Sequence, residues 1–162
     1  MDVNKFKVGG FVEIRLSPRK EDSGLWKIVE AYEMKDDNES FYRIKLDQDE
    51  SELGDEIWAE YYPSMPKRLA ILREEDSFPI DQAQSWPPPT GIIIDEIEFT
   101  TLDPEANDEQ HDGFEAFNDG EEYTHWEYED EESKNLLQIT LVDSYVTMYR
   151  GYSLNTGLVK LI

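Results

Sequence analysis

Residues 95–132 carry one sign of charge at a density that few folded segments tolerate. They contain 17 Asp and Glu residues and no Lys or Arg. Like charges repel one another and oppose compaction, so this segment needs apolar anchors if it is to fold. Such anchors are present as aromatic residues among the acidic ones: Phe99, Phe114, Phe117, Tyr123, Trp126 and Tyr128. We therefore predict a folded acidic surface and not a disordered tail.

The charge of the whole chain restricts its partners. The 162 residues have a formal net charge of −23, which makes direct binding to a phosphate backbone unfavourable. Residues 1–90 contain 12 Lys and Arg and 20 Asp and Glu, a net charge of −8. Residues 91–162 contain three and 18, a net charge of −15. This asymmetry predicts a basic protein or peptide partner, steered by charge and released by salt, and no nucleic acid.

Composition also bears on location. The chain has no cysteine, which rules out disulfides and thiolate metal sites. Its first residues lack the apolar core of a signal peptide, and its apolar runs are far shorter than the ~20 residues of a membrane span. We expect a soluble cytoplasmic protein with no membrane partner, and a small chain of this kind suggests a bacterial source.

Alternation of apolar and polar side chains predicts an all-β fold. In the first half, turn-forming residues separate five short strands, which at this spacing favour a small barrel. The predicted strands are residues 6–16, 25–34, 41–48, 57–63 and 67–75, of which 57–63 also fits a helical turn.

This half resembles the SH3-like barrels of the Tudor and Agenet type. The matching strands read VGGFVEI, GLWKIVEAY, FYRIKL and EIWAEYY, within residues 6–73. The resemblance implies a barrel whose aromatic residues at one mouth hold a methylated Lys or Arg by cation–π contacts. The residues that it suggests are Trp26, Tyr32, Tyr42, Trp58, Tyr61 and Tyr62. The alternative is that rings such as Trp26 and Tyr42 belong to the core.

The second half predicts a separate β unit. Residues 77–90 contain three successive prolines and form a stiff linker between a barrel at 1–76 and an acidic antiparallel unit at 91–162. Within the second unit we predict a strand at 91–102 with a bulge near Asp95, a loop at 103–113, a hairpin at 114–130 and two strands at 134–154. Residues 155–162 add a last strand or a docked tail. The two units are expected to pack together.

Residues 91–154 are similar to a family of small, uncharacterised bacterial β domains. The matching residues are Gly120, Glu121, Tyr123, Trp126, Tyr128 and Asp130, then Leu136 to Thr140, then Tyr149, Gly151 and Tyr152. This resemblance implies a fold and carries no activity.

The acidic loop invites comparison with calcium sites. Aligning Gly113 with the glycine of a helix–loop–helix calcium loop places Ala116 where an oxygen ligand belongs, and the flanks are predicted strands. A non-standard site would use Asp103, Asp108, Asp112 and Asp119. The alternative is a solvated acidic loop.

Catalytic patterns are missing from the sequence. The chain has no phosphate-binding glycine loop and no nucleophile elbow. His111 and His125 form no metal-binding pair. Carboxylates are too numerous for any two to mark a general acid and base. We expect neither enzyme activity nor a cofactor.

The leading hypothesis is a non-catalytic acidic module that binds a basic partner. Its candidate binding residues are Trp58, Tyr61, Tyr62, Asp55, Glu56, Asp108, Asp112 and Asp119. One alternative is an inhibitor that mimics nucleic acid to occupy a DNA-binding protein, and another is an acidic β domain stabilised by divalent cations. Exposed strand edges would also allow a homodimer, against the repulsion of like charges.

Overall fold

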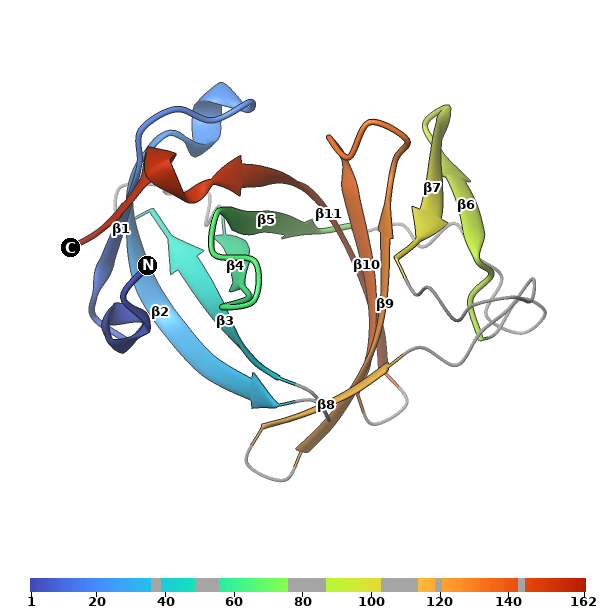
Figure 1. Ribbon diagram of the computed structural model, residues 1–162, viewed down its shortest axis with the longest axis horizontal. Helices are drawn as coiled ribbons and strands as arrows, with labels where there is room; N and C mark the ends of the chain where they lie inside the picture. Colours follow the sequence, from blue (N-terminus) through green and yellow to red (C-terminus); the bar gives the residue numbers. More distant parts are fainter. Residues whose placement is uncertain (36–38, 49–55, 76–86, 103–113, 119–120, 143–144) are drawn as a thin grey trace. The chain divides into compact units, whose positions relative to one another are not determined.

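The computed structural model confirms an all-β chain (Figure 1). It describes residues 1–35, 39–48, 56–75, 87–102, 114–118, 121–142 and 145–162. The helices in these ranges are 3-10 segments of three residues: η1 (Val3–Lys5), η2 (Lys20–Asp22) and η3 (Thr156–Leu158). None of the helices in the described ranges has the length and apolar character needed to cross a membrane.

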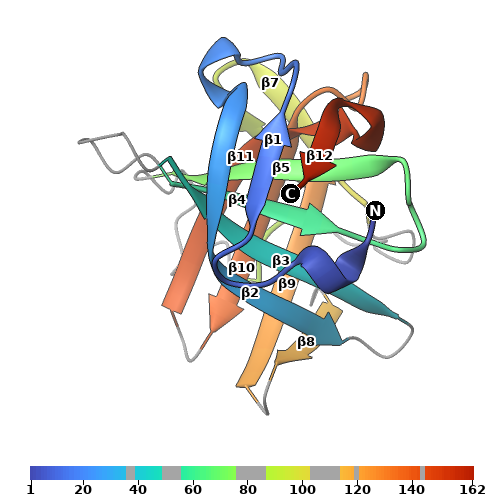
Figure 2. The ribbon, with the colours of Figure 1, turned by 90° about the vertical axis from the view of Figure 1, so that its left-hand side faces the viewer.

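The chain divides into two compact units. The first comprises Met1–Arg73 and Ser153–Ile162, and the second comprises Glu74–Tyr152. The sequence placed all of 91–162 in the second unit, whereas the last ten residues lie in the first. The reason is a long-range pairing: the C-terminal strand β12 (Val159–Leu161) pairs antiparallel with β1 (Phe11–Ile14), beside which Figure 2 shows it in red.

The first unit is built on antiparallel strands that follow one another in the order β12, β1, β2 (Gly24–Lys35), β3 (Ser40–Asp47), β4 (Glu56–Tyr61) and β5 (Arg68–Glu74). Residues 57–61 are therefore strand and not helix. Apolar side chains from every one of these strands except β12 are fully buried, each stabilising the fold by about 1.5–3 kcal/mol. They include Val12, Ile14, Trp26, Ile28, Ile44, Leu46, Ile57, Leu69 and Ile71.

A β-bulge in β2 decides which side chains share a face. The pairing with β3 shifts between Ile28, opposite Leu46, and Glu30, opposite Lys45. Strict alternation would point Ile28 and Glu30 to the same side. The extra residue, Val29, instead sends Glu30 to the face opposite Ile28, because a bulge places two residues against one on the partner strand.

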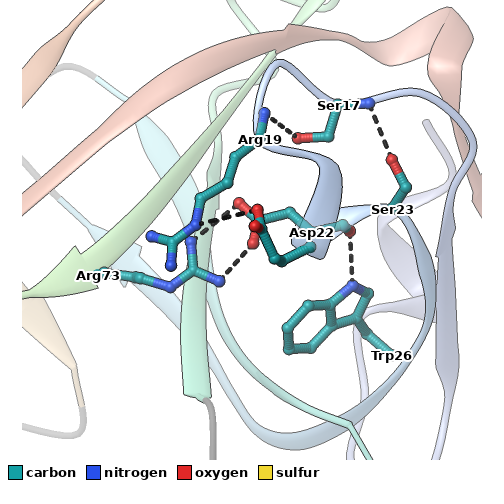
Figure 3. A network of polar contacts seen from close by, with 7 residues as sticks. Ser17, Arg19, Asp22, Ser23, Trp26 and Arg73 are labelled. Atoms are coloured by element: carbon teal, nitrogen blue, oxygen red, sulfur yellow. Dashed lines mark hydrogen bonds and ion pairs between the residues drawn. The ribbon is translucent and has the colours of Figure 1, made fainter.

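A buried ion pair ties the loop after β1 to β5 (Figure 3). Arg73 donates from Nη1 to Oδ2 of Asp22 at 2.9 Å and from Nη2 to Oδ1, and the Asp22 side chain is fully buried. The indole Nε1 of Trp26 donates to the backbone oxygen of Asp22 at 2.9 Å. The backbone N–H of Ser17 donates to Oγ of Ser23 at 3.1 Å and closes the loop across its base. Polar contacts therefore fix this loop.

The second unit contains β6 (Gly91–Ile94), β7 (Ile97–Thr101), β8 (Phe114–Asn118), β9 (Glu121–Glu129), β10 (Leu136–Val142) and β11 (Tyr145–Asn155), which continues into the first unit. The strands are ordered β11, β10, β9, β7, β6, and β8 also pairs with β9. The predicted hairpin and the two strands after it are thus confirmed. The core consists of Ile92, Phe99, Trp126, Tyr128, Leu137, Ile139 and Met148.

Residues 91–102 do not form the single bulged strand predicted from the sequence. They form the β6–β7 hairpin, visible in yellow and green in Figure 1, with Ile94 opposite Ile97. The turn consists of Asp95 and Glu96, whose φ angles are 51° and 67°. Positive φ at both central residues is the geometry of a type I′ turn, which normally selects Asn and Gly. An ion pair of 2.6 Å from Arg150 Nη1 to Asp95 Oδ2 holds this turn to β11.

Candidate binding surfaces

The first candidate surface is an aromatic and charged cluster on β2, β3 and β4. Cross-strand pairing aligns Tyr32 with Arg43, Arg43 with Glu60, and Lys45 with both Glu30 and Trp58. The rings of Tyr32 and Trp58 stack with centroids 6.3 Å apart. Glu30 and Tyr32 share a face with Lys45 and Arg43 because the bulge at Val29 shifts the register of β2 against β3.

The chain's own cations occupy this cluster. Arg43 Cζ lies 4.6 Å from the centroid of the Trp58 ring and Lys45 Nζ lies 5.6 Å from it, both within cation–π range. Lys45 Nζ also lies 3.2 Å from Glu30 and 3.0 Å from Glu56, and Arg43 forms a buried ion pair of 3.7 Å with Glu60. Two cations and three carboxylates give these contacts a net charge of only −1, which leaves little charge to attract a ligand.

The contacts in the cluster shift the pKa values of its groups. The hydroxyl of Tyr32 donates to Glu30 at 2.6 Å and is the largest cause of a lowered pKa of Glu30, with Lys45 adding to it against partial burial. Partial burial acts to lower the pKa of Lys45, but its hydrogen bonds to Glu56 and Glu30 outweigh that effect and raise the pKa. Both groups are held in their charged forms.

The structure does not bring the three predicted aromatic ligands together. Trp58 lies in the cluster just described. The Tyr61 side chain is on the opposite face of β4, buried, with its ring 5.8 Å from that of Phe6. The Tyr62 ring stacks on Phe41 at 4.6 Å. Each ring thus has a different aromatic neighbour.

Of the other predicted ligands, Glu56 is exposed and binds Lys45, as described. Trp26 is fully buried, as the core alternative for this residue predicts. The remaining candidates, Asp55, Asp103, Asp108, Asp112 and Asp119, lie outside the described residues.

The second candidate surface lies on the second unit, and we call it the acidic face: Ile97, Glu98, Thr100, Asp130, Glu131 and Glu132. These residues line a shallow hollow of about 470 Å³. Glu98 and Thr100 project from β7, and Asp130–Glu132 follow β9 directly. The register that pairs Thr100 with Glu129 brings the end of β9 beside β7. The sequence pattern does not predict this face, because its carboxylates come from segments about 30 residues apart.

The carboxylate of Asp130 has a structural role in the acidic face, because it accepts hydrogen bonds from the turn that follows β9. Its Oδ1 accepts the backbone N–H groups of Lys134 at 2.8 Å and Asn135 at 3.0 Å, and its Oδ2 accepts Asn135 Nδ2 at 2.7 Å. Slight burial opposes ionisation, but these hydrogen bonds outweigh it and lower the pKa of Asp130. The carboxylate therefore stays charged and fixes the turn that presents Glu131 and Glu132.

The second unit holds nearly all of the net charge. The first unit contains 13 Lys and Arg and 16 Asp and Glu, a net charge of −3. The second contains two and 22, a net charge of −20. Both of its cations already have carboxylate partners: Lys134 with Glu132 at 2.8 Å, and Arg150 with Asp95 and Glu75. Most of its carboxylates therefore have no cation of their own unit to neutralise them.

Neither metal nor histidine chemistry is evident in the described part of the chain. Among the described residues, no group of three or more His, Asp or Glu side chains is arranged to hold a metal ion. His125 is fully buried on β9, opposite Thr140 of β10, and His111 lies outside the described residues.

Comparisons with protein-family models, with curated proteins and with solved structures found no significant match to this chain. The resemblances of residues 6–73 to Tudor-type barrels and of 91–154 to bacterial β domains accordingly stay predictions.

Proposed function

We propose that the protein is a non-catalytic binding module whose second unit engages a basic protein or peptide. The observation that carries this proposal is the separation of charge between the units, −20 against −3. A surface with such an excess of carboxylates attracts cations over the distance of a Debye length, about 8 Å at physiological ionic strength.

The two surfaces differ in what they offer such a partner. In the cluster around Trp58, Arg43 and Lys45 already lie beside the ring and the carboxylates, so an incoming cation would have to displace them. The acidic face presents Glu98 and Glu131, which are exposed, beside the apolar side chain of Ile97. We therefore assign the basic partner to the second unit and a structural role to the cluster around Trp58.

The experiment compares matched charge neutralisations. A fluorescent lysine-rich peptide is titrated with the wild type, with Glu98→Gln/Glu131→Gln, and with Glu21→Gln/Glu33→Gln as the control in the first unit. All four residues are exposed, and each double variant removes two negative charges. We expect the first variant to weaken binding by about fivefold, since each exposed charge is worth up to ~1 kcal/mol. The control should change it by less than about twofold.

Salt provides the second readout. Affinity for the lysine-rich peptide should fall as sodium chloride rises, with a shallower dependence for Glu98→Gln/Glu131→Gln than for the wild type. Equal effects of the two double variants, or binding that salt does not weaken, would contradict the proposal.

A further inference from the structure

We infer that the outer edge of β6, with which no strand pairs among the described residues, accepts an extended segment of the basic partner by antiparallel strand addition. This inference rests on the proposed function and gives it a mode of binding. It depends on the position of β6 in the sheet, the direction of its backbone hydrogen-bonding groups, its exposed side chain and the charge around it.

β6 is a terminal strand of its sheet. Its residues pair with β7, and among the residues that the structure describes no strand pairs with it on the other side. Proteins usually protect such an edge with Lys, Pro or an inward-pointing charge. The sequence of β6, Gly-Ile-Ile-Ile, contains none of these. In the described part of the chain, neither a paired strand nor one of these protective residues within β6 therefore blocks the edge.

The hairpin register shows which backbone groups point outward. In an antiparallel pair, residues that exchange hydrogen bonds alternate with residues that do not. Thr101 N–H donates to Thr90 O at 2.9 Å, so Ile92 and Ile94 also bond across to β7. The N–H and C=O groups of Gly91 and Ile93 must then point away from β7. These two residues present the donors and acceptors for an added strand.

The side chains around this edge define two different faces. Ile93 is 70% exposed and lies opposite Glu98, which lines the acidic face. Ile92 is buried in the core of the second unit, and Ile94 packs against that core. An added strand would continue both faces, because side chains alternate along it. Its residues on the Ile93 side would approach carboxylates, and those on the Ile92 side would extend the apolar core.

The net charge of the second unit indicates which kind of segment would pair with β6. A second copy of this chain would bring a unit of net charge −20 against another of −20. A segment that alternates Lys or Arg with apolar residues is complementary instead. Neighbouring strands lie about 4.8 Å apart, so Glu98 is about 10 Å from the added strand, within the joint reach of a Glu and a Lys side chain. We commit to a basic, extended segment of a partner protein.

The experiment uses a ten-residue peptide that alternates Lys and Val, added to isotope-labelled full-length protein. We expect amide hydrogen exchange of Gly91 and Ile93 to slow by at least tenfold. A peptide that alternates Glu and Val should leave both amides unchanged. Slowed exchange that is confined to other residues would overturn the inference.

Backbone methylation of the peptide provides the matched control. In an antiparallel added strand, the peptide residues opposite Gly91 and Ile93 turn their backbone N–H and C=O groups toward β6. They also share the face of Glu98, so they are the Lys residues. Methylating the backbone nitrogens of Lys removes the donors that face β6 and should weaken binding at least tenfold. Methylating those of Val alters the outer edge of the peptide only and should cost less than threefold. Equal losses would overturn strand addition.

A protein variant tests the same point from the other side. Ile93→Pro removes the outward N–H without breaking a bond to β7, and Pro is tolerated at strand edges. We expect it to weaken binding of the Lys-Val peptide at least tenfold, while Ile93→Thr, which keeps the N–H, stays within threefold. Should Ile93→Pro fail to fold, the methylated peptides decide the question alone.

Failure of this inference is distinguishable from failure of the proposed function. Salt-sensitive peptide binding that depends on Glu98 and Glu131 but tolerates Lys methylation would overturn strand addition and keep the basic partner. Concentration-dependent dimerisation without peptide, with protection at Gly91 and Ile93, would overturn the choice of occupant.

Discussion

Asp22 and Arg73 form a two-point ion pair across 51 positions of sequence, with both carboxylate oxygens of the fully buried Asp22 bound by the guanidinium. It joins the loop that contains η2 to β5 within the first unit. Removing one partner of a buried pair leaves the other charge without compensation.

We therefore predict that Arg73→Met destabilises the protein by about 3 kcal/mol. Asp22→Leu/Arg73→Met should cost less than Arg73→Met alone, because it leaves no buried charge behind. Urea unfolding of the two variants and the wild type measures both values. If the double variant is less stable than Arg73→Met, the expectation is wrong. The Asp22–Arg73 contacts would then stabilise the fold by more than the cost of burying the two charges.

The pKa of Glu30 should depend mainly on Tyr32. Tyr32→Phe removes the largest cause of its lowering, so the pKa of Glu30 should rise toward its ordinary value of 4.5. A lowered pKa stabilises the fold above the ordinary value, and this stability is lost as pH falls through the folded pKa. The variant should therefore lose less stability on acidification than the wild type.

Carboxyl NMR titration of Glu30 measures this shift directly. Tyr145→Phe is the control, since Tyr145 is exposed and lies in the second unit. An unchanged titration midpoint in Tyr32→Phe would show that Lys45 and Arg43 hold the pKa of Glu30 down without Tyr32.

Glu96→Gly should stabilise the protein, although glycine substitutions usually do the opposite. The φ of Glu96 is 67°, a left-handed conformation that costs a residue with a Cβ about 1–2 kcal/mol and glycine almost nothing. The greater chain entropy of unfolded glycine offsets part of this gain, which leaves about 0.5 kcal/mol. Glu98→Gly, in the middle of β7, should instead destabilise by a similar amount. The urea midpoints of the two variants should therefore move in opposite directions.

Tyr128→Phe should cost about 1 kcal/mol at neutral pH, because the Tyr128 hydroxyl donates to Pro89 O at 2.7 Å and anchors the segment before β6. Burial raises the pKa of Tyr128 well above its ordinary value of 10.0. A raised pKa contributes stability that is complete below pH 10 and is lost as pH rises toward the folded value. The wild type should thus lose more stability than the variant above pH 10. Circular dichroism at increasing pH measures this, and parallel loss in both proteins would contradict it.

The sequence by itself determined most of the strands. Period-two alternation and turn residues located β1 to β5, the β8–β9 hairpin and the β10–β11 pair, because local burial patterns follow from which residues are apolar. Of the aromatic residues predicted to anchor the acidic segment, Phe99, Trp126 and Tyr128 lie in the core of the second unit.

The tertiary structure decided which side chains meet. The bulge at Val29 turns Glu30 away from the side of Ile28, and the turn at Asp95 and Glu96 splits one predicted strand into two. Local sequence preferences predict neither the bulge nor the turn. For the turn, Asp-Glu is not a favoured type I′ pair. The acidic face and the pairing of β12 with β1 join segments distant in sequence. Bringing distant segments together costs chain entropy. The register in which they pair is set only when the sheet and its core assemble.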